Sequence, residues 1–158
     1  MEQPISRTTY SLRPAMESDY EFLYQLHAAT IRPVVEATWG WDEAFQAEYF
    51  RTHWDATRRQ IVQGNGVDIG TITLEQHQTA IFLALVEIHP DYQGRGIGTA
   101  LIRDVVAAAH RRGLRVELQV LKANVRARRL YEQLGFQITE ERAERYVMTA
   151  PNEAIDDP

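Results

Sequence analysis

The spacing of apolar residues along the chain shifts between the period of a strand and that of a helix. Residues 10–13 alternate in polarity and stop at Pro14, which predicts a short first strand. Apolar residues then recur at helical spacing after Ser18, a candidate N-cap, and predict a helix over residues 19–30. The chain therefore begins with a strand and an amphipathic helix.

A proline and a glycine interrupt the helical pattern in the next segment. Pro33 has no backbone N–H to donate, and Gly40 is a poor residue for the interior of any regular element. We therefore expect a second helix over residues 42–54, joined to the first by an irregular or bent link.

Three apolar segments separated by turn residues predict three successive strands, over residues 60–63, 67–75 and 79–88. Gly64-Asn65-Gly66 supplies the first turn, because asparagine and glycine accept the backbone angles of a tight hairpin. Pro90 ends the third strand.

Clear helices alternate with strands in the second half of the chain. Residues 97–112 form the strongest predicted helix, because their apolar residues share one face and Gly113 follows as a stop. The remaining elements are a strand, a helix that Asn124 can cap, and two final strands: residues 114–121, 125–134, 137–141 and 145–149.

The predicted order of elements, β-α-α-β-β-β-α-β-α-β-β, indicates a mixed α/β fold. An antiparallel meander comes first and helical crossovers come after it. The length predicts one domain over residues 1–150. Residues 151–158 contain two prolines, three acids and little apolar content, which predicts a disordered acidic tail.

The composition is that of a soluble globular protein and argues against several classes of function. Of the 158 residues, 44% are apolar and 25% charged, and the net charge of −5 argues against a general nucleic-acid or anionic-membrane binder. There are no cysteines, which excludes disulfides and a cysteine nucleophile, and the five histidines lack metal-ligand spacing. Without a signal-peptide pattern or a membrane-length apolar run, a cytoplasmic protein is expected.

Three glycines at alternate positions stand between a buried strand and the strongest helix. The segment reads Gln93-Gly94-Arg95-Gly96-Ile97-Gly98-Thr99. Glycines let backbone N–H groups approach a ligand closely, and a helix N-terminus adds unpaired donors and a positive dipole end. These features favour a phosphate cradle, although a glycine-rich loop can also serve only to turn the chain.

Two other phosphate-binding motifs do not match this loop. A P-loop needs a lysine after its last glycine, and none is present. A dinucleotide-binding fingerprint needs glycine or alanine where this chain has Thr99. The alternative function is that of a dinucleotide-binding oxidoreductase, and binding of NAD would support it.

A second motif downstream resembles that of a known family when it is read together with the first. Leu118-x-Val120-x-x-x-Asn124-x-x-Ala127-x-x-Leu130-Tyr131-x-x-x-Gly135-Phe136 follows Gln93-x-x-Gly96-x-Gly98. In this order the two motifs resemble those of the GNAT superfamily of N-acetyltransferases, over at least residues 60–149. The resemblance implies the GNAT fold: a mixed, mostly antiparallel central sheet with a splayed pair of parallel strands, flanked by helices.

The resemblance implies a site for acetyl-coenzyme A where the two parallel strands separate. Backbone groups of Val86, Glu87 and Ile88 would hold the pantetheine arm and the acetyl carbonyl. Gln93 would stand at the entrance of the loop, and the amides of residues 94–99 would hold the pyrophosphate. Asn124 would bond the pantetheine side, would cap its helix, or would do both.

The resemblance also implies a general acid, and it leaves the base open. Tyr131 would protonate the leaving thiolate, although it could instead be a core aromatic. Gln119 and Phe82 occupy the two positions at which branches of the family place a glutamate. Glu87 is the nearest remaining carboxylate on the central strand and is the candidate base or amine anchor. The alternative is a charge that faces the sheet edge.

The acceptor is expected beside a segment that mixes aromatic and charged residues. GNAT acceptors usually lie between the first helices and the strand after the glycine helix, and the candidates there are Arg32, Glu36, Trp39 and Trp41. Aromatic faces and carboxylates suit a cationic amine, and Arg32 could pair with an acceptor carboxylate. The same residues could instead pack the first helices or begin the second one.

The expected function is acetyl transfer from acetyl-coenzyme A to a primary amine by direct attack in a ternary complex, since no cysteine can carry the acetyl group. The acceptor would be a small-molecule or peptide amine. The alternative is a module that binds acyl-coenzyme A without transfer. No metal, nucleic-acid or membrane partner is expected, and the resemblance makes a homodimer an expectation.

Overall fold

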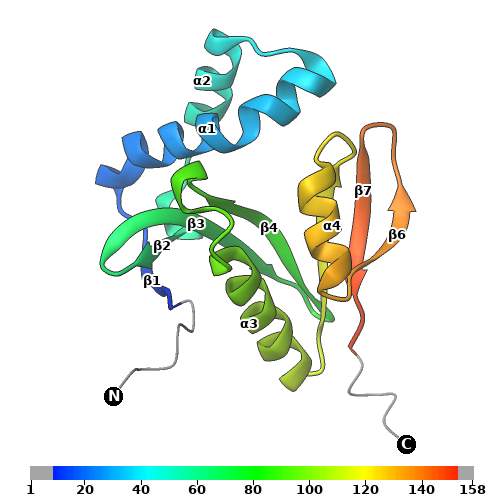
Figure 1. Cartoon of the computed structure of the whole chain (residues 1–158). Coiled ribbons are helices and arrows are strands. Elements are labelled where there is room, and N and C mark those ends of the chain that lie inside the picture. Colours follow the sequence, from blue (N-terminus) through cyan, green and yellow to red (C-terminus); the bar gives the residue numbers. More distant parts are fainter. Residues whose placement is uncertain (1–8, 153–158) are drawn as a thin grey trace, which may run out of the picture.

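A mixed sheet of seven strands is the centre of this computed structural model, which describes residues 9–152 (Figure 1). The strands lie in the order β1-β2-β3-β4-β5-β7-β6. Neighbouring strands are antiparallel except for β4 and β5. In chain order they are β1 (Ser11–Pro14), β2 (Gln60–Gly64), β3 (Val67–Gln76), β4 (Ala80–Ile88), β5 (Arg115–Leu121), β6 (Gln137–Glu141) and β7 (Arg145–Ala150).

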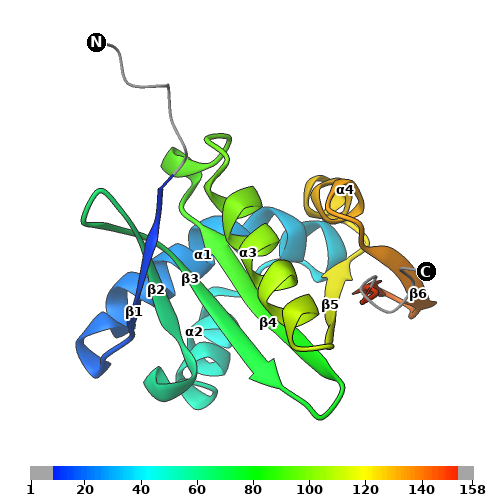
Figure 2. The ribbon, with the colours of Figure 1, turned by 90° about the horizontal axis from the view of Figure 1, so that it is seen from below.

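Helices cover both faces of this sheet, so the predicted fold class is confirmed. The α3 face carries α3 and α4, and the opposite α1 face carries α1 and α2 (Figures 1 and 2). The helices are α1 (Tyr20–Trp39), α2 (Glu43–Thr52), α3 (Ile97–Arg111) and α4 (Val125–Gln133), with 3-10 turns η1 (Glu17–Asp19), η2 (Ala56–Arg58) and η3 (Pro90–Tyr92).

Alternation of side chains along the strands divides the apolar residues between two cores. On β2, Ile61 points to the α1 face and packs with Leu23, Leu26 and Phe50. The next residue, Val62, points to the α3 face and joins the larger core there. Each such buried side chain stabilises the fold by about 1.5–3 kcal/mol.

The parallel strands β4 and β5 pair over only part of their length. Residues 80–83 of β4 pair with residues 115–118 of β5, and beyond this point the two strands continue without pairing to each other. The register between β3 and β4 slips at the same place, because Leu83 opposes Leu74 while Leu85 opposes Thr73. Such a bulge bends a strand and increases its twist. This bulge accounts for the separation of β4 from β5. The region where the two strands separate is the splay.

Helix α1 runs through Pro33, so the predicted break before the second helix is misplaced. A proline inside a helix removes one hydrogen bond and costs about 3 kcal/mol or more. Leu23 and Leu26 before the proline and Val35 after it are all buried, and this packing stabilises one continuous helix. The helix ends at Trp39, and Gly40 caps it with a φ of 84°.

The start of α1 also differs from the prediction, because Ser18 does not cap it. Ser18 lies within η1, and Asp19 is the residue before the helix. The Asp19 side chain makes no cap bond, because Arg13 and the N–H of Met16 donate to its carboxylate.

The other elements have the predicted type and order, with ends that differ by one or two residues. The first hairpin has the predicted turn, with φ of 52° at Asn65 and 78° at Gly66. Pro151 and Asn152 have no regular structure, and the rest of the predicted disordered tail lies outside the described residues.

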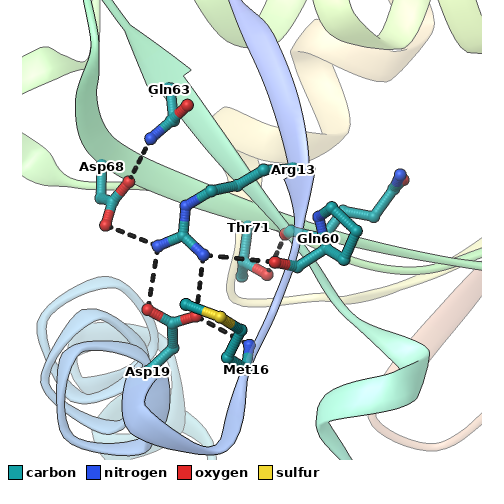
Figure 3. Close-up of polar contacts among 8 residues, drawn as sticks. Arg13, Met16, Asp19, Gln60, Gln63, Asp68 and Thr71 are labelled. Atoms are coloured by element: carbon teal, nitrogen blue, oxygen red, sulfur yellow. Dashed lines mark hydrogen bonds and ion pairs between the residues drawn. The ribbon is translucent and has the colours of Figure 1, made fainter.

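One guanidinium joins three elements at the start of α1 (Figure 3). Arg13 of β1 donates to both carboxylate oxygens of Asp19 at 2.9 Å and to Oδ2 of Asp68, in β3, at 2.8 Å. Gln63 donates to the other oxygen of Asp68 at 2.8 Å. The hydrogen bonds from Arg13 lower the pKa of Asp19, although burial opposes this shift. This network fixes α1 against the sheet.

The change Asp19→Asn is expected to destabilise the fold by about 1–3 kcal/mol at pH 7, because Arg13 loses its charge-assisted partner. The pKa of Asp19 is lower in the folded than in the unfolded chain, so its contribution is present above the unfolded value of about 3.9 and is lost as the pH falls through the folded value. Urea denaturation should therefore show the difference between variant and wild type shrinking below about pH 4.

Asp91→Asn is the matched control, because the Asp91 side chain is 82% exposed. It should change the free energy of unfolding by less than about 0.5 kcal/mol. An Asp19→Asn difference that stays constant down to acidic pH would contradict the assigned role of the ion pair.

Candidate active site

The loop after β4 has the backbone geometry of an anion cradle. Gly94 and Gly96 have φ of 76° and 83°, in the left-handed region that favours glycine. Gly96 is the N-cap of α3, and no side chain of the described residues caps this helix. The amides of residues 97–99 therefore lack intrahelical partners and lie at the positive end of the helix dipole. This arrangement can accept an anionic group.

Space for a ligand is present beside this loop. A Cβ built on Gly94 would meet no heavy atom within 4 Å, and one built on Gly98 would meet only Ile88 Cγ1 at 3.9 Å. The side chain of Arg95 lies over the ring of Tyr92, with its guanidinium carbon 5.1 Å from the ring centre. The loop is thus open at its glycines and flanked by a positive charge.

Gln93 connects the two sides of the splay. Its Nε2 donates to the carbonyl of Ile88 at 2.8 Å, and its Oε1 accepts from Nη1 of Arg126 at 2.8 Å. Ile88 is the last residue of β4, and Arg126 lies in the first turn of α4. One side chain therefore ties the end of β4 to α4.

Backbone groups of β4 are available on the edge that faces the splay. The carbonyl of Ile88 turns toward Gln93, whereas the next residue, His89, donates its N–H to Ile69 of β3. Since the direction of backbone groups alternates along a strand, Val86 shares the orientation of Ile88. The splay is thus lined by extended backbone without a neighbouring strand.

Two motif residues of α4 have defined local roles. Asn124 Oδ1 accepts from the N–H of Ala127 at 3.2 Å, so the predicted cap is confirmed, and its amide NH₂ can still donate to a ligand. Tyr131 is buried in the core of the α3 face and packs on Phe136, with ring centroids 5.7 Å apart. Burial raises the pKa of Tyr131 to about 12, so the phenol keeps its proton at neutral pH.

Glu87 is buried on the α1 face, so the alternative of a charge facing the sheet edge is wrong. Its Oε2 accepts from Oγ1 of Thr30 at 2.9 Å and lies 2.8 Å from Nδ1 of His27. Glu87 Oε1 and Nη1 of Arg59 are buried and have no hydrogen-bond partner within the described part of the chain. Burial lowers the pKa of Arg59, and the nearby charge of Glu87 opposes this shift. The carboxylate therefore lies in a polar cluster between β4 and α1.

The residues His27, Thr30 and Arg59 were not among those predicted from the sequence. One signal was present, because His27 and Thr30 are polar residues three positions apart on a helix face that otherwise buries Leu23 and Leu26. A buried polar side chain needs a partner, and the sequence alone does not show that Glu87 is that partner.

Three of the predicted acceptor residues form a surface cluster away from Glu87, in which Arg32 and Glu36 are exposed and Trp41 is half-buried. Arg32 lies over Trp41, with its guanidinium carbon 5.4 Å from the ring centre, and its Nε is 3.4 Å from Oε1 of Glu36. Trp41 donates its indole N–H to Glu43 at 2.7 Å. At about 100° per residue, Arg32 and Glu36 lie on the opposite side of α1 from His27.

Trp39 instead faces a different part of the sheet. It is the last residue of α1 and is 56% exposed. The guanidinium carbon of Arg145, the first residue of β7, lies 5.7 Å from the centre of a Trp39 ring. The end of α1 is therefore beside β7, with an aromatic surface open to solvent.

The described residues hold neither a candidate metal site nor a candidate membrane span. Within residues 9–152, no group of three or more His, Asp or Glu side chains could hold a metal ion. No helix in the described part of the chain is both long and apolar enough to cross a membrane.

Sequence comparison connects the chain to known acetyltransferases. The model of the Acetyltransferase (GNAT) family matches residues 20–136. An uncharacterized N-acetyltransferase of Methanocaldococcus jannaschii is 29% identical over 147 residues, which cover 82% of this chain and 61% of that relative. The chain thus spans about three fifths of the length of this relative.

Solved structures share the fold at low sequence identity. PaiA N-acetyltransferase of Thermoplasma acidophilum, in complex with coenzyme A, has a TM-score of 0.74 and 16% identity, covering 90% of this chain and 99% of its own. Naa50 of Arabidopsis thaliana, in complex with the bisubstrate analogue CoA-Ac-MVNAL, has a TM-score of 0.60 and 21% identity, covering 89% and 97%. Since the family model spans most of the sheet, its crossover helices and the cradle, the chain belongs to the acetyltransferase (GNAT) family.

Proposed function

We propose that this protein transfers the acetyl group of acetyl-coenzyme A to a primary amine by direct attack in a ternary complex. The observation that carries this proposal is the uncapped N-terminus of α3, directly beside the unpaired edge of β4. A module that binds acyl-coenzyme A without transfer is the second candidate. It is favoured by Gln119 and Phe82, which stand where branches of the family have a glutamate.

The coenzyme would use the two open backbone surfaces. The pyrophosphate would lie on the amides of residues 94–99, where helix-terminal donors favour an anion by about 0.3–1 kcal/mol or more. The pantetheine arm would pair with the free edge of β4 at Val86 and Ile88, beside the backbone of Glu87. The amide NH₂ of Asn124 would complete the site, because its Oδ1 is already occupied as a cap.

The chemistry requires the ammonium nitrogen to lose two protons, one before the attack and one as the amide forms, and it requires one proton to reach the sulfur. An alkylammonium has a pKa of about 10.4, so its neutral form costs about 4.6 kcal/mol at pH 7. Glu87 supplies negative charge on the α1 face, as base or amine anchor. Tyr131, which stays protonated, supplies the proton for the thiolate.

The acceptor would be a small-molecule or peptide amine on the α1 face. Trp39 beside Arg145 offers an aromatic surface near β7, and the cluster of Arg32, Glu36 and Trp41 offers charges of both signs. A homodimer, a cytoplasmic location and a single domain over residues 1–150 remain predictions, of which light scattering tests the first.

Calorimetric titration of the protein is expected to show binding of acetyl-coenzyme A and none of NAD. A panel of small-molecule and peptide amines should then stimulate thiol release from acetyl-coenzyme A. Binding without release for any amine would favour the non-transferring module. Absence of binding at about millimolar ligand, the weak end of biological affinities, would reject the cradle.

The change Gly96→Ala is expected to weaken acetyl-coenzyme A binding at least about tenfold, equivalent to about 1.4 kcal/mol. An alanine at φ of 83° is strained by about 1–2 kcal/mol, and relief of this strain turns the cradle amides away. Gly113→Ala is the matched control, because Gly113 follows the other end of α3 at φ of 72°. It should cost similar stability and leave the affinity unchanged; equal losses of affinity in both variants would count against the cradle.

The change Tyr131→Phe is expected to lower kcat by about 10²-fold with little change in the KM of the amine, because the thiolate loses its proton donor. The raised pKa of Tyr131 gives a second readout, which is the pH dependence of the free energy of unfolding. The neutral phenol stabilises the fold below the unfolded pKa of about 10, and this contribution is lost as the pH rises through about 12.

As the pH rises above about 10, the free energy of unfolding of Tyr131→Phe should therefore fall less than that of wild type, as denaturant titrations can measure. Tyr49→Phe is the control, because Tyr49 is 52% exposed. Unchanged kcat in Tyr131→Phe would leave Tyr131 as a core aromatic only.

A further inference from the structure

His27 and Glu87 form a polar pair between α1 and β4 that the coenzyme contacts do not use. His27 Nδ1 lies 2.8 Å from Glu87 Oε2, and the two side chains come from positions 60 residues apart. We propose that His27 accepts the proton that the acceptor amine loses, and that Glu87 is the positioning residue that orients its imidazole. This inference rests on the proposed acetyl transfer and names the base within it.

The side chains of His27 and Glu87 differ in their exposure to solvent. The Glu87 side chain is 4% exposed, whereas that of His27 is 22% exposed. A carboxylate beneath α1 meets an acceptor only if the helix moves, while the imidazole already reaches the surface. Glu87 Oε2 is also shared by two donors, since the hydroxyl of Thr30 bonds to the same oxygen at 2.9 Å.

The hydrogen bond determines which nitrogen of His27 can act. A carboxylate only accepts, so Nδ1 of the neutral ring carries the hydrogen and Nε2 carries the lone pair. Within residues 9–152, the hydrogen bonding of the ring is through Nδ1. Once Nε2 takes a proton, the adjacent carboxylate stabilises the imidazolium, as in the pairing of histidine with a carboxylate in hydrolases.

The groups around the pair favour this arrangement. The His27 ring lies against Phe50 of α2, with centroids 5.6 Å apart, which limits its rotation. Arg59, before β2, places its guanidinium carbon 5.1 Å from the centre of the same Phe50 ring and interacts electrostatically with Glu87. The buried carboxylate is thus balanced by positive charge, as buried charges require.

Two protons leave the acceptor nitrogen during the reaction, and one proton reaches the sulfur. The acceptor ammonium first gives one proton to Nε2 of His27, which passes it to solvent. The neutral amine nitrogen then forms a bond to the acetyl carbon, and the second proton that it loses goes to the same Nε2. The C–S bond breaks, and the sulfur takes a proton from Tyr131. His27 then releases its proton to solvent through its exposed side, and the phenol of Tyr131 is restored from solvent.

The test compares His27→Gln, Glu87→Gln and the double variant in purified full-length protein. His27→Gln is expected to lower kcat at saturating amine by about 10²–10⁴-fold, the usual contribution of a general base. Calorimetric affinity for acetyl-coenzyme A and the thermal midpoint should stay near wild type. The acid-side fall of kcat measured at saturating amine, which reports ionisation within the bound complex, should flatten.

Glu87→Gln should lower kcat less than His27→Gln, because the amide still orients the ring but lacks the charge. The double variant should be no slower than His27→Gln alone, since the two residues act as one unit. His77→Gln is the matched control, because the His77 side chain is 58% exposed and follows the last residue of β3.

A second variant covers the case in which glutamine disturbs the packing of α1. In His27→Ala, added imidazole should restore part of the lost kcat, and it should not stimulate His77→Ala. Rescue of this kind requires a missing base and does not follow from a structural role.

Three outcomes would overturn the inference. If His27→Gln keeps the wild-type kcat and pH profile, the role of His27 as base is rejected, and the proposed transferase function is not affected. A larger loss in Glu87→Gln, with the acid limb kept in His27→Gln, would make Glu87 the base. Wild-type protein that binds acetyl-coenzyme A yet releases no thiol with any amine would reject the transferase function, and this inference with it.

Discussion

The separation of β4 from β5 beyond Leu83 is the constraint on which the rest of the structure depends. A strand inside a sheet has hydrogen bonds on both edges, and where β5 departs, one edge of β4 loses its partners. Gln93 satisfies the carbonyl of Ile88 and holds Arg126 of α4 on the other side. The glycine loop follows directly, so the free edge and the anion cradle are fixed relative to each other by one strand.

The two faces of the sheet divide the chemistry between them. The α3 face carries the cradle, the cap at Asn124 and the buried phenol of Tyr131. The α1 face carries the cluster around Glu87, where His27 reaches the surface. Side chains of β4 enter both faces, and Arg13 fixes α1 at the start of the second face.

Local signals recovered most of the architecture, and they failed where distant contacts outweighed them. The turn at Asn65 and Gly66 and the glycine end of α3 depend on the backbone preferences of those residues, so their pattern predicts them correctly. Pro33 was expected to end the first helix, but burial of Val35 and the preceding leucines keeps α1 continuous. Ser18 was expected to cap it, but Arg13 holds the neighbouring Asp19.

The sequence by itself determined the family resemblance and pointed to the glycine loop and the candidate acid, because the motif residues of each lie close together in the chain. Only the tertiary structure decided the surroundings of Glu87. Strand alternation turns its side chain to the α1 face, and the packing of α1 brings His27 to it across 60 residues. The packing of α1 also places Trp39 beside Arg145 and leaves Arg32 and Glu36 on the outer side of the helix. Contacts of this kind depend on how whole elements pack, and no local pattern in the chain encodes them.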